Sequence, residues 1–188
     1  MIAALAALLL SAGPAAAAPA DPCAPRGDAR DADRTSACEL LGAIDRRVPD
    51  GTWRALGPVA DEVLAALARG GGLVVFRARA LEALAARGGA EAEAAHRALA
   101  IDGAAPMMVR RAAVHGLSRL LDDAALTAAL APLAERDADG RVRAEASEVL
   151  ARRVPAAACA GVRARASAGG VEAIRLERAL RACGAAER

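Results

Sequence analysis

Three stretches in the middle of the chain repeat one pattern of apolar and polar positions. They begin at Phe76, Val109 and Val142, and each step between them is 33 residues. Within each stretch, apolar or small residues fall at positions i, i+4, i+7 and i+8, which form one face of an α-helix. A fixed period of this size is typical of stacked helical units. The second residue of every stretch is an arginine: Arg77, Arg110 and Arg143.

Other amphipathic stretches alternate with these three. We predict helices over 58–69, 91–101 and 124–136, where apolar residues again recur at helical spacing. Asp122 and Asp123 precede the last of these helices and can cap its first turn. The linkers carry helix breakers, including the glycines at 70–72 and the pair Asp139 and Gly140. The middle of the chain therefore predicts a stack of antiparallel helical hairpins.

This pattern resembles HEAT repeats, in particular the short HEAT-like repeats of bilin lyases. In that family an Asp in the turn precedes a Val-Arg pair by about five residues, and Ala and Leu follow along the second helix. Asp137, Val142 and Arg143 match this stretch, followed by Ala146 and Leu150. Asp102 and Arg110 match one repeat earlier with two extra residues in the turn, and Arg77 matches without the Asp. The resemblance covers residues 58–153 and implies an all-α fold, a HEAT-like or armadillo-like α-solenoid, while it says little about activity.

The recurring Asp and Arg have a structural explanation. The turn aspartates can cap the helix that follows them. The repeated arginines lie one repeat apart and can pair with turn carboxylates or carbonyl oxygens of a neighbour. The alternative is a ladder of arginines for phosphate groups. Acidic residues on the same helices, such as Glu82 and Glu145, would cancel its field, so we prefer the structural explanation.

Both ends of the predicted stack have the features of caps. Ser36 and Glu39 fit a capping box that opens a helix from 36 to about 47, and residues 171–182 predict a last helix. Terminal units of a solenoid lack one neighbour and need extra support. We therefore divide the mature chain into an N-terminal arm over 21–35 and a solenoid over 36–188.

Residues 1–20 have the pattern of a secretory signal peptide. An uninterrupted apolar run over 2–10 is too short to cross a bilayer, which needs about 20 residues. Ala18 and Ala20 supply small side chains for cleavage before Asp21, although the start of the chain lacks Lys and Arg. An Ala-rich leader without this role is the alternative. We expect export to the periplasm or to the medium, and no membrane span.

All four cysteines follow the predicted cleavage site. An even number of cysteines behind an export signal indicates two disulfides. Of the three possible pairings, proximity in sequence favours Cys23–Cys38 and Cys159–Cys183. A metal site is the alternative, but the chain offers no CxxC or HxxxH spacing for one. We expect neither a metal nor a cofactor.

Composition narrows the class of partner. Alanine makes up 57 of the 188 residues, and all 25 cationic residues are arginines, against 23 acidic ones. These residue types favour helices. Trp53 and Phe76 are the only aromatic residues, too few for stacking on single-stranded nucleic acid. The net charge of +2 is also too small for a polybasic nucleic-acid binder. We expect no nucleic-acid partner.

Two histidines and the acidic residues are the remaining candidates for chemistry. His115 shares a column with Glu82 and Glu148 at the 33-residue step. This stripe could bind a cation weakly or accept a basic residue of a partner, but we interpret it as a solvated face, and His96 as a surface residue. No nucleophile, phosphate-binding glycine loop or carboxylate pair stands out, so no catalytic residue is assigned.

These observations predict a non-catalytic exported scaffold. It would act as a monomer and bind another protein along its concave face, lined by the second helix of each repeat. The alternatives are an enzyme or enzyme accessory of the bilin-lyase-like kind, and a HEAT protein that handles nucleic acid. The candidate binding residues on the concave face are Arg79, Glu82, His115, Glu145 and Glu148.

Overall fold

The chain is all-α over residues 21–43 and 45–186, which are the residues that the computed structural model describes. The predicted signal peptide at 1–20 lies outside them. The described residues form eleven helices and no strand. In chain order the helices are α1 (Asp31–Gly42), α2 (Asp50–Arg54), α3 (Val59–Arg69), α4 (Val74–Arg87), α5 (Gly89–Ile101), α6 (Met107–Leu120), α7 (Asp123–Arg136), α8 (Gly140–Arg153), α9 (Pro155–Ser167), α10 (Gly170–Arg175) and α11 (Glu177–Ala186).

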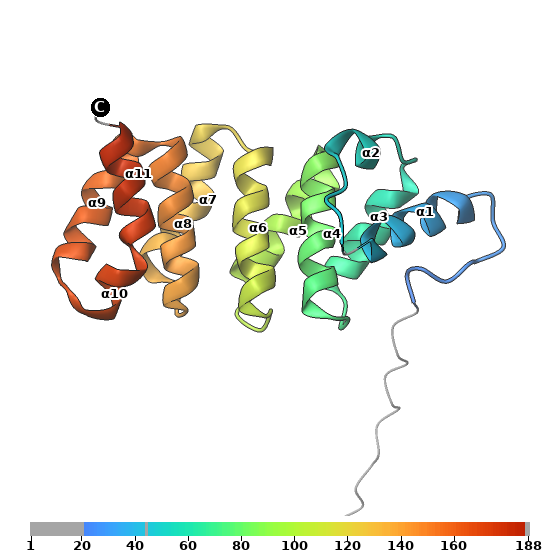
Figure 1. The fold of residues 1–188 in the computed structure, drawn as a ribbon, viewed down its shortest axis with the longest axis horizontal. Coiled ribbons are helices and arrows are strands. Elements are labelled where there is room, and N and C mark those ends of the chain that lie inside the picture. Colours follow the sequence, from blue (N-terminus) through green and yellow to red (C-terminus); the bar gives the residue numbers. More distant parts are fainter. Residues whose placement is uncertain (1–20, 44, 187–188) are drawn as a thin grey trace, which may run out of the picture.

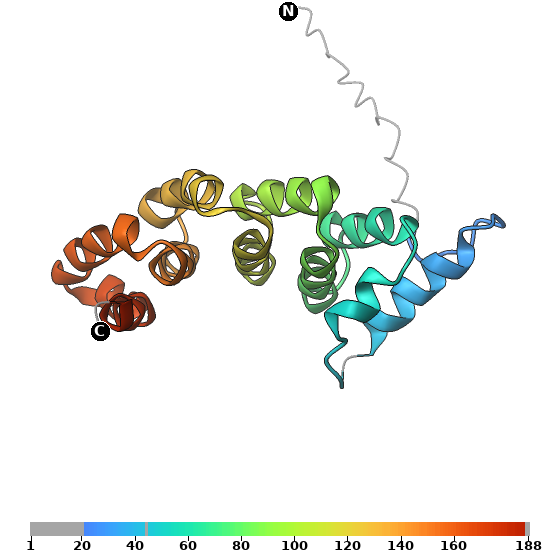
Figure 2. The same ribbon diagram turned by 90° about the horizontal axis from the view of Figure 1, so that it is seen from above.

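From α3 onward the helices form two layers. In Figure 1, α4, α6 and α8 stand side by side in front, with α5 and α7 behind them. Figure 2 shows these front helices nearly end on, while the rear helices lie lengthwise along the row. The row is bent, and the front layer lies on its concave side. We call the surface of α4, α6 and α8, flanked by α2 and α11, the inner face.

Neighbouring helices supply most of the packing, as stacked hairpins require. The principal contacts join α3 to α4, α5 to α6 and α7 to α8, and α6 packs in turn against α4 and α8. The predicted helices at 58–69, 91–101 and 124–136 correspond to α3, α5 and α7, with each boundary within two residues.

Residues one repeat apart occupy equivalent places in the core. Leu84, Leu117 and Leu150 all belong to the largest apolar cluster and expose at most 5% of their surface. A second set, Ala80, Ala113 and Ala146, is fully buried in the same cluster. Because alanine has a small side chain, these positions allow the helices to pack closely. The 33-residue period is therefore a period of core packing.

The repeated arginines satisfy main-chain groups at the turns. Nε of Arg77 donates to Ala68 O (2.9 Å), Nε of Arg110 to Ala100 O (3.1 Å), and Nη1 of Arg143 to Asp137 O (2.7 Å). The last carbonyls of a helix have no partner within the helix, and they attract cations. Arg110 also pairs with the Asp137 carboxylate of the next turn. These are the contacts expected from the structural explanation.

The turn aspartates Asp102 and Asp137 do not cap the helices that follow them, contrary to the prediction from the sequence. Asp139, two residues after Asp137, caps α8 by accepting from Arg141 N (2.8 Å). Asp102 instead accepts from Ala104 N (2.9 Å), within a turn that ends before Pro106. Asp102 and Asp137 each accept from the N–H two residues later, so both lie too early in their turns to reach the first N–H groups of the helix. Asp122 does cap α7 as predicted, by accepting from Ala125 N (2.8 Å).

The ends of the chain differ from the prediction in three ways. Helix α1 begins at Asp31 rather than at Ser36, and the Asp31 carboxylate accepts from Arg26 N (2.9 Å) and Gly27 N (2.8 Å) before it. The predicted last helix is broken at Leu176, which is buried against Cys159 and separates α10 from α11. Helices α2 and α9 were not predicted. Tertiary packing, rather than local sequence, determines these boundaries.

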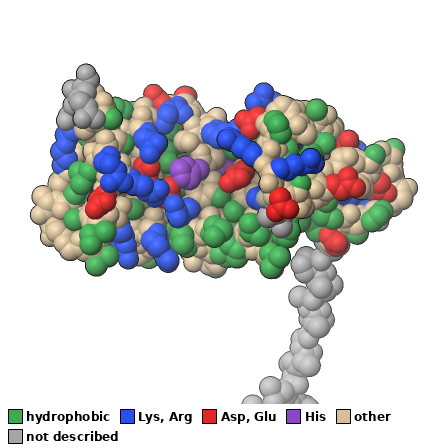
Figure 3. Space-filling model, in the orientation of Figure 1, with side chains coloured by type: hydrophobic (Ala, Val, Ile, Leu, Met, Phe, Trp, Pro, Cys, Tyr) green, Lys and Arg blue, Asp and Glu red, His purple; other side chains and the backbone are tan. Residues whose placement is uncertain are grey.

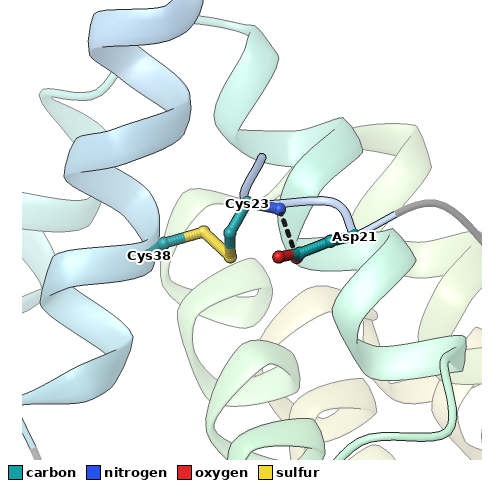
Figure 4. The surroundings of a disulfide bond; sticks show 3 residues. All are labelled: Asp21, Cys23 and Cys38. Atoms are coloured by element: carbon teal, nitrogen blue, oxygen red, sulfur yellow. Dashed lines mark hydrogen bonds between the residues drawn. A yellow bond between two sulfur atoms is a disulfide. The ribbon is translucent and has the colours of Figure 1, made fainter. Parts of the chain in front are cut away.

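Two disulfides join segments at the two ends of the row. Cys23 pairs with Cys38 (Cα–Cα 6.0 Å) and Cys159 with Cys183 (Cα–Cα 5.6 Å), which is the pairing favoured from the sequence. In Figure 4, Cys38 projects from α1 toward Cys23, whose N–H donates to the Asp21 carboxylate (2.9 Å). The second disulfide joins α9 to α11. Both indicate an oxidising compartment, because structural disulfides rarely persist in the reducing cytosol.

Candidate functional site

The inner face contains a groove between residues 45–53 and helices α4 and α6. Its volume is about 610 Å³. Val48, Trp53 and Val75 form its apolar part together with alanines of α4 and α6. Charged side chains from three segments surround the groove. Two of them, Arg119 of α6 and Asp50 of α2, form an ion pair (Nη2–Oδ2 2.5 Å). Eight of its fifteen described lining residues are ionisable, so the groove offers charge and hydrogen bonding beside its apolar part.

Three of the five predicted binding residues line this groove. Arg79 is half-buried, and its Nη2 donates to Ala43 O (2.9 Å), which ties α4 to the segment after α1. Glu82 and His115 are exposed on neighbouring helices. The 33-residue column that joins them in the sequence is thus a row across the inner face, from α4 to α6.

The other two predicted residues, Glu145 and Glu148, lie beneath side chains rather than on a solvated face. Their side chains expose only 1% and 7% of their area. The interpretation of the Glu82, His115 and Glu148 stripe as a solvated face is therefore wrong for Glu148, because α11 packs against α8 at this position. The sequence pattern of α8 alone does not show this cover, since α11 lies about thirty residues further along the chain.

These two glutamates join three helices through ion pairs. Glu145 contacts Arg111 and His115 of α6, and Arg178 of α11 lies 3.3 Å from it. Glu148 pairs with Arg152 Nη2 (2.8 Å) on its own helix and with Arg178 Nε (2.9 Å). Arg178 thus bridges both carboxylates. A buried carboxylate needs partners of this kind, because an unpaired buried charge is strongly destabilising.

The environment of Glu145 keeps it ionised. Burial alone would raise the pKa of its carboxyl group. The hydrogen bond from His115 and the charges of His115 and Arg111 outweigh burial and lower the pKa to about 2. Glu145 is therefore a permanent anion near neutral pH, and it holds the cationic side chains around it in place.

His96 is buried, although the sequence analysis placed it on the surface. Its Nδ1 lies 2.6 Å from Ala92 O, one turn earlier on α5. Gly116 of α6 faces the ring, and a Cβ at this position would lie 2.0 Å from its Nε2. Burial lowers the pKa of His96, against the opposing effect of the Ala92 and Leu81 carbonyls, so the ring is kept neutral. A glycine in the middle of α6 was the sequence signal for this close approach.

The described part of the chain shows no arrangement of metal ligands or membrane-spanning elements. Within residues 21–43 and 45–186, no three His, Cys, Asp or Glu side chains converge as metal ligands would. Over the same residues, every helix is too short or too polar to span a bilayer. What the inner face offers is a groove, hydrogen-bond donors and charge, which are the means of recognising another molecule.

Comparisons with known proteins yield no match for this chain. No family model matches it, and neither a curated protein nor a solved structure does. What the inner face can do is therefore inferred from its own geometry and charge.

Proposed function

We propose that this protein is a non-catalytic HEAT-like α-solenoid scaffold that binds a segment of another protein along its inner face. The observation that carries the proposal is the 610 Å³ groove on the concave side of the row, between residues 45–53 and helices α4 and α6. Val75 and Trp53 give it an apolar part, and Arg79, Glu82 and Arg119 give it polar groups. A groove of this volume accommodates a few side chains of a polypeptide segment rather than a large globular surface.

The repeat assignment is supported by packing as well as by sequence. Three helical pairs follow one another at a 33-residue period, and equivalent leucines fill the core between them. The repeated arginines all bind turn carbonyls. Solenoids of this kind present extended concave surfaces to their ligands. The inner face lies on the concave side of this row of helices.

We place the protein in the periplasm or outside the cell. Two disulfides support an oxidising compartment. The apolar run over residues 2–10, followed by small residues, supports export by a cleaved signal peptide.

Site-specific photo-crosslinking in cells that express the full chain tests the proposal. A photoreactive residue at Val75, in the groove, should capture a partner protein. The same residue at Ala98, exposed on α5 in the other layer, is the matched control and should not. Val75→Gln should reduce co-purification of the captured protein, whereas Ala98→Gln should leave it unchanged. Equal capture at both positions, or capture at Ala98 alone, would refute binding along the inner face.

A further inference from the structure

Charge is divided unequally between the two layers. Helices α4, α6 and α8 carry ten arginines and three glutamates. Helices α3, α5 and α7 carry six acidic residues and three arginines. Because the whole chain has a net charge of only +2, this is a separation of charge and not an excess. In Figure 3, which shows the inner face, basic side chains gather over α8 and α11.

Many of these arginines hold the fold together and are not available to a ligand. Six of the ten donate to main-chain carbonyl oxygens of neighbouring segments: Arg77, Arg79, Arg87, Arg110, Arg143 and Arg153. Of the other four, Arg119 pairs with Asp50 of α2 and Arg141 with Asp139 at the start of α8. The remaining two, Arg111 and Arg152, form a smaller group with the arginines of α11. We call Arg111, Arg152, Arg178 and Arg181 the arginine cluster.

The arginine cluster lies above its own counter-charges. Its four side chains expose between 36% and 67% of their area, whereas Glu145 and Glu148 below them are almost fully covered. Over these two glutamates the guanidinium groups therefore form the outer surface, whereas Arg181 pairs with the exposed Glu177 of its own helix. Arg111 and Arg178 use Nε and Nη2 for these glutamates, and among the described residues Nη1 of each has no hydrogen-bond partner.

A second hollow of about 560 Å³ opens at this cluster. Arg152, Arg178 and Arg181 line it together with alanines of α8 and α11, and among residues 21–43 and 45–186 no acidic side chain lines it. Two of these arginines are held in position by Glu148. An arginine that is already oriented loses less entropy on binding, and its planar N–H groups match the two oxygens of a carboxylate.

We infer that this hollow binds the carboxylate side chains of an acidic segment of the protein partner, an inference that rests on the proposed function. The alanines between the arginines suit the aliphatic part of Glu or Asp. A nucleic acid would need a continuous basic track, but the neighbouring groove carries Asp45, Asp50 and Glu82. In this arrangement the acidic residues of the partner segment bind in the hollow at α8 and α11, and an apolar side chain of the same segment binds in the groove at α4 and α6.

Peptide binding to the purified full-length protein tests this inference. A fluorescein-labelled oligo-glutamate peptide should bind in an anisotropy titration. Oligo-glutamine and oligo-lysine peptides of the same length should not bind. Binding should weaken as salt is raised, because the contacts are exposed. The double variant Arg152→Gln with Arg181→Gln should weaken binding about tenfold, for two exposed charge-assisted contacts. It retains Arg178, which bridges the two buried glutamates.

Arg97→Gln is the control. Arg97 is similarly exposed and ion-paired, but it lies on α5 in the other layer, so binding should be unchanged. Equal weakening by Arg97→Gln, or no weakening by the double variant, would overturn the inference. The inference would also be overturned if duplex DNA binds the wild type as tightly as oligo-glutamate does and the double variant no longer binds this DNA. That result would favour a general polyanion site. If crosslinking at Val75 persists undiminished in the double variant, the acidic-segment inference fails while the proposed function stands.

Discussion

A glycine that faces a buried histidine makes the most direct test of the packing between α5 and α6. Gly116→Ala would place a Cβ 2.0 Å from the His96 ring, well inside ordinary van der Waals contact. At an exposed helical site this substitution stabilises by about 1 kcal/mol, because alanine is the better helix former. Here both residues are buried and His96 is fully covered, so the ring or the helix must shift to accept the methyl group. Overpacking costs about 1–3 kcal/mol, and an approach this close falls at the upper end of that range, so after the helix-propensity gain we expect a net loss of about 2 kcal/mol.

A double-mutant cycle isolates this contact. His96→Ala alone removes a buried ring and leaves a cavity, so we expect it to destabilise by about 2 kcal/mol or more. In the His96→Ala background, Gly116→Ala has room for its methyl group and should stabilise by about 1 kcal/mol. The sign of the Gly116→Ala effect should therefore reverse between the two backgrounds.

Urea unfolding of the oxidised protein, followed by circular dichroism at 222 nm or an equivalent helical signal, measures all four free energies. The reasoning is refuted if Gly116→Ala is neutral or stabilising in the wild-type background. It is also refuted if the substitution destabilises equally in both backgrounds, because the ring would then not be the obstacle.

Four further predictions follow from the core, the buried carboxylate, the disulfides and the leader. Leu117→Ala should cost about 2–5 kcal/mol in the same unfolding assay, because Leu117 is buried at the centre of the repeats. The folded-state pKa of Glu145 lies below its ordinary value of 4.5, so its ionised form should stabilise the protein above pH 4.5. This contribution should be lost as the pH falls toward 2. Glu145→Gln should flatten that part of the stability–pH curve. Reduction of the disulfides should speed amide exchange in α1 and α11 before it affects α6, as hydrogen exchange would show. N-terminal sequencing of the protein from a cell fraction should find Asp21 first, and an intact Met1 would contradict cleavage.

The repeated helices could be predicted because their signal is local. Apolar residues at helical spacing, glycine-rich linkers and a fixed period all lie within short stretches of sequence. The equivalence of Leu84, Leu117 and Leu150 follows from that period alone. The disulfides were also accessible, since each joins cysteines at most 24 residues apart.

The parts that could not be predicted depend on contacts between distant segments. Glu145 and Glu148 have the pattern of exposed residues on α8, and their burial results from the docking of α11. His96 is polar, and its burial depends on the missing side chain of Gly116, twenty residues later. Leu176 interrupts the last helix because its side chain packs with Cys159 and Val162. In each case the decisive partner belongs to another helix.

The two disulfides have a consequence for how the protein resists proteolysis in an oxidising compartment. In a linear array each unit is held only by its neighbours, so local opening ordinarily starts at an end, where one interface is missing. Here a covalent bond ties α1 to the preceding segment at one end and α9 to α11 at the other. The segments at each end then cannot unravel one at a time and must detach as a linked unit. A protease that attacks transiently opened chains would meet frayed ends less often, so the disulfides confer kinetic resistance to degradation.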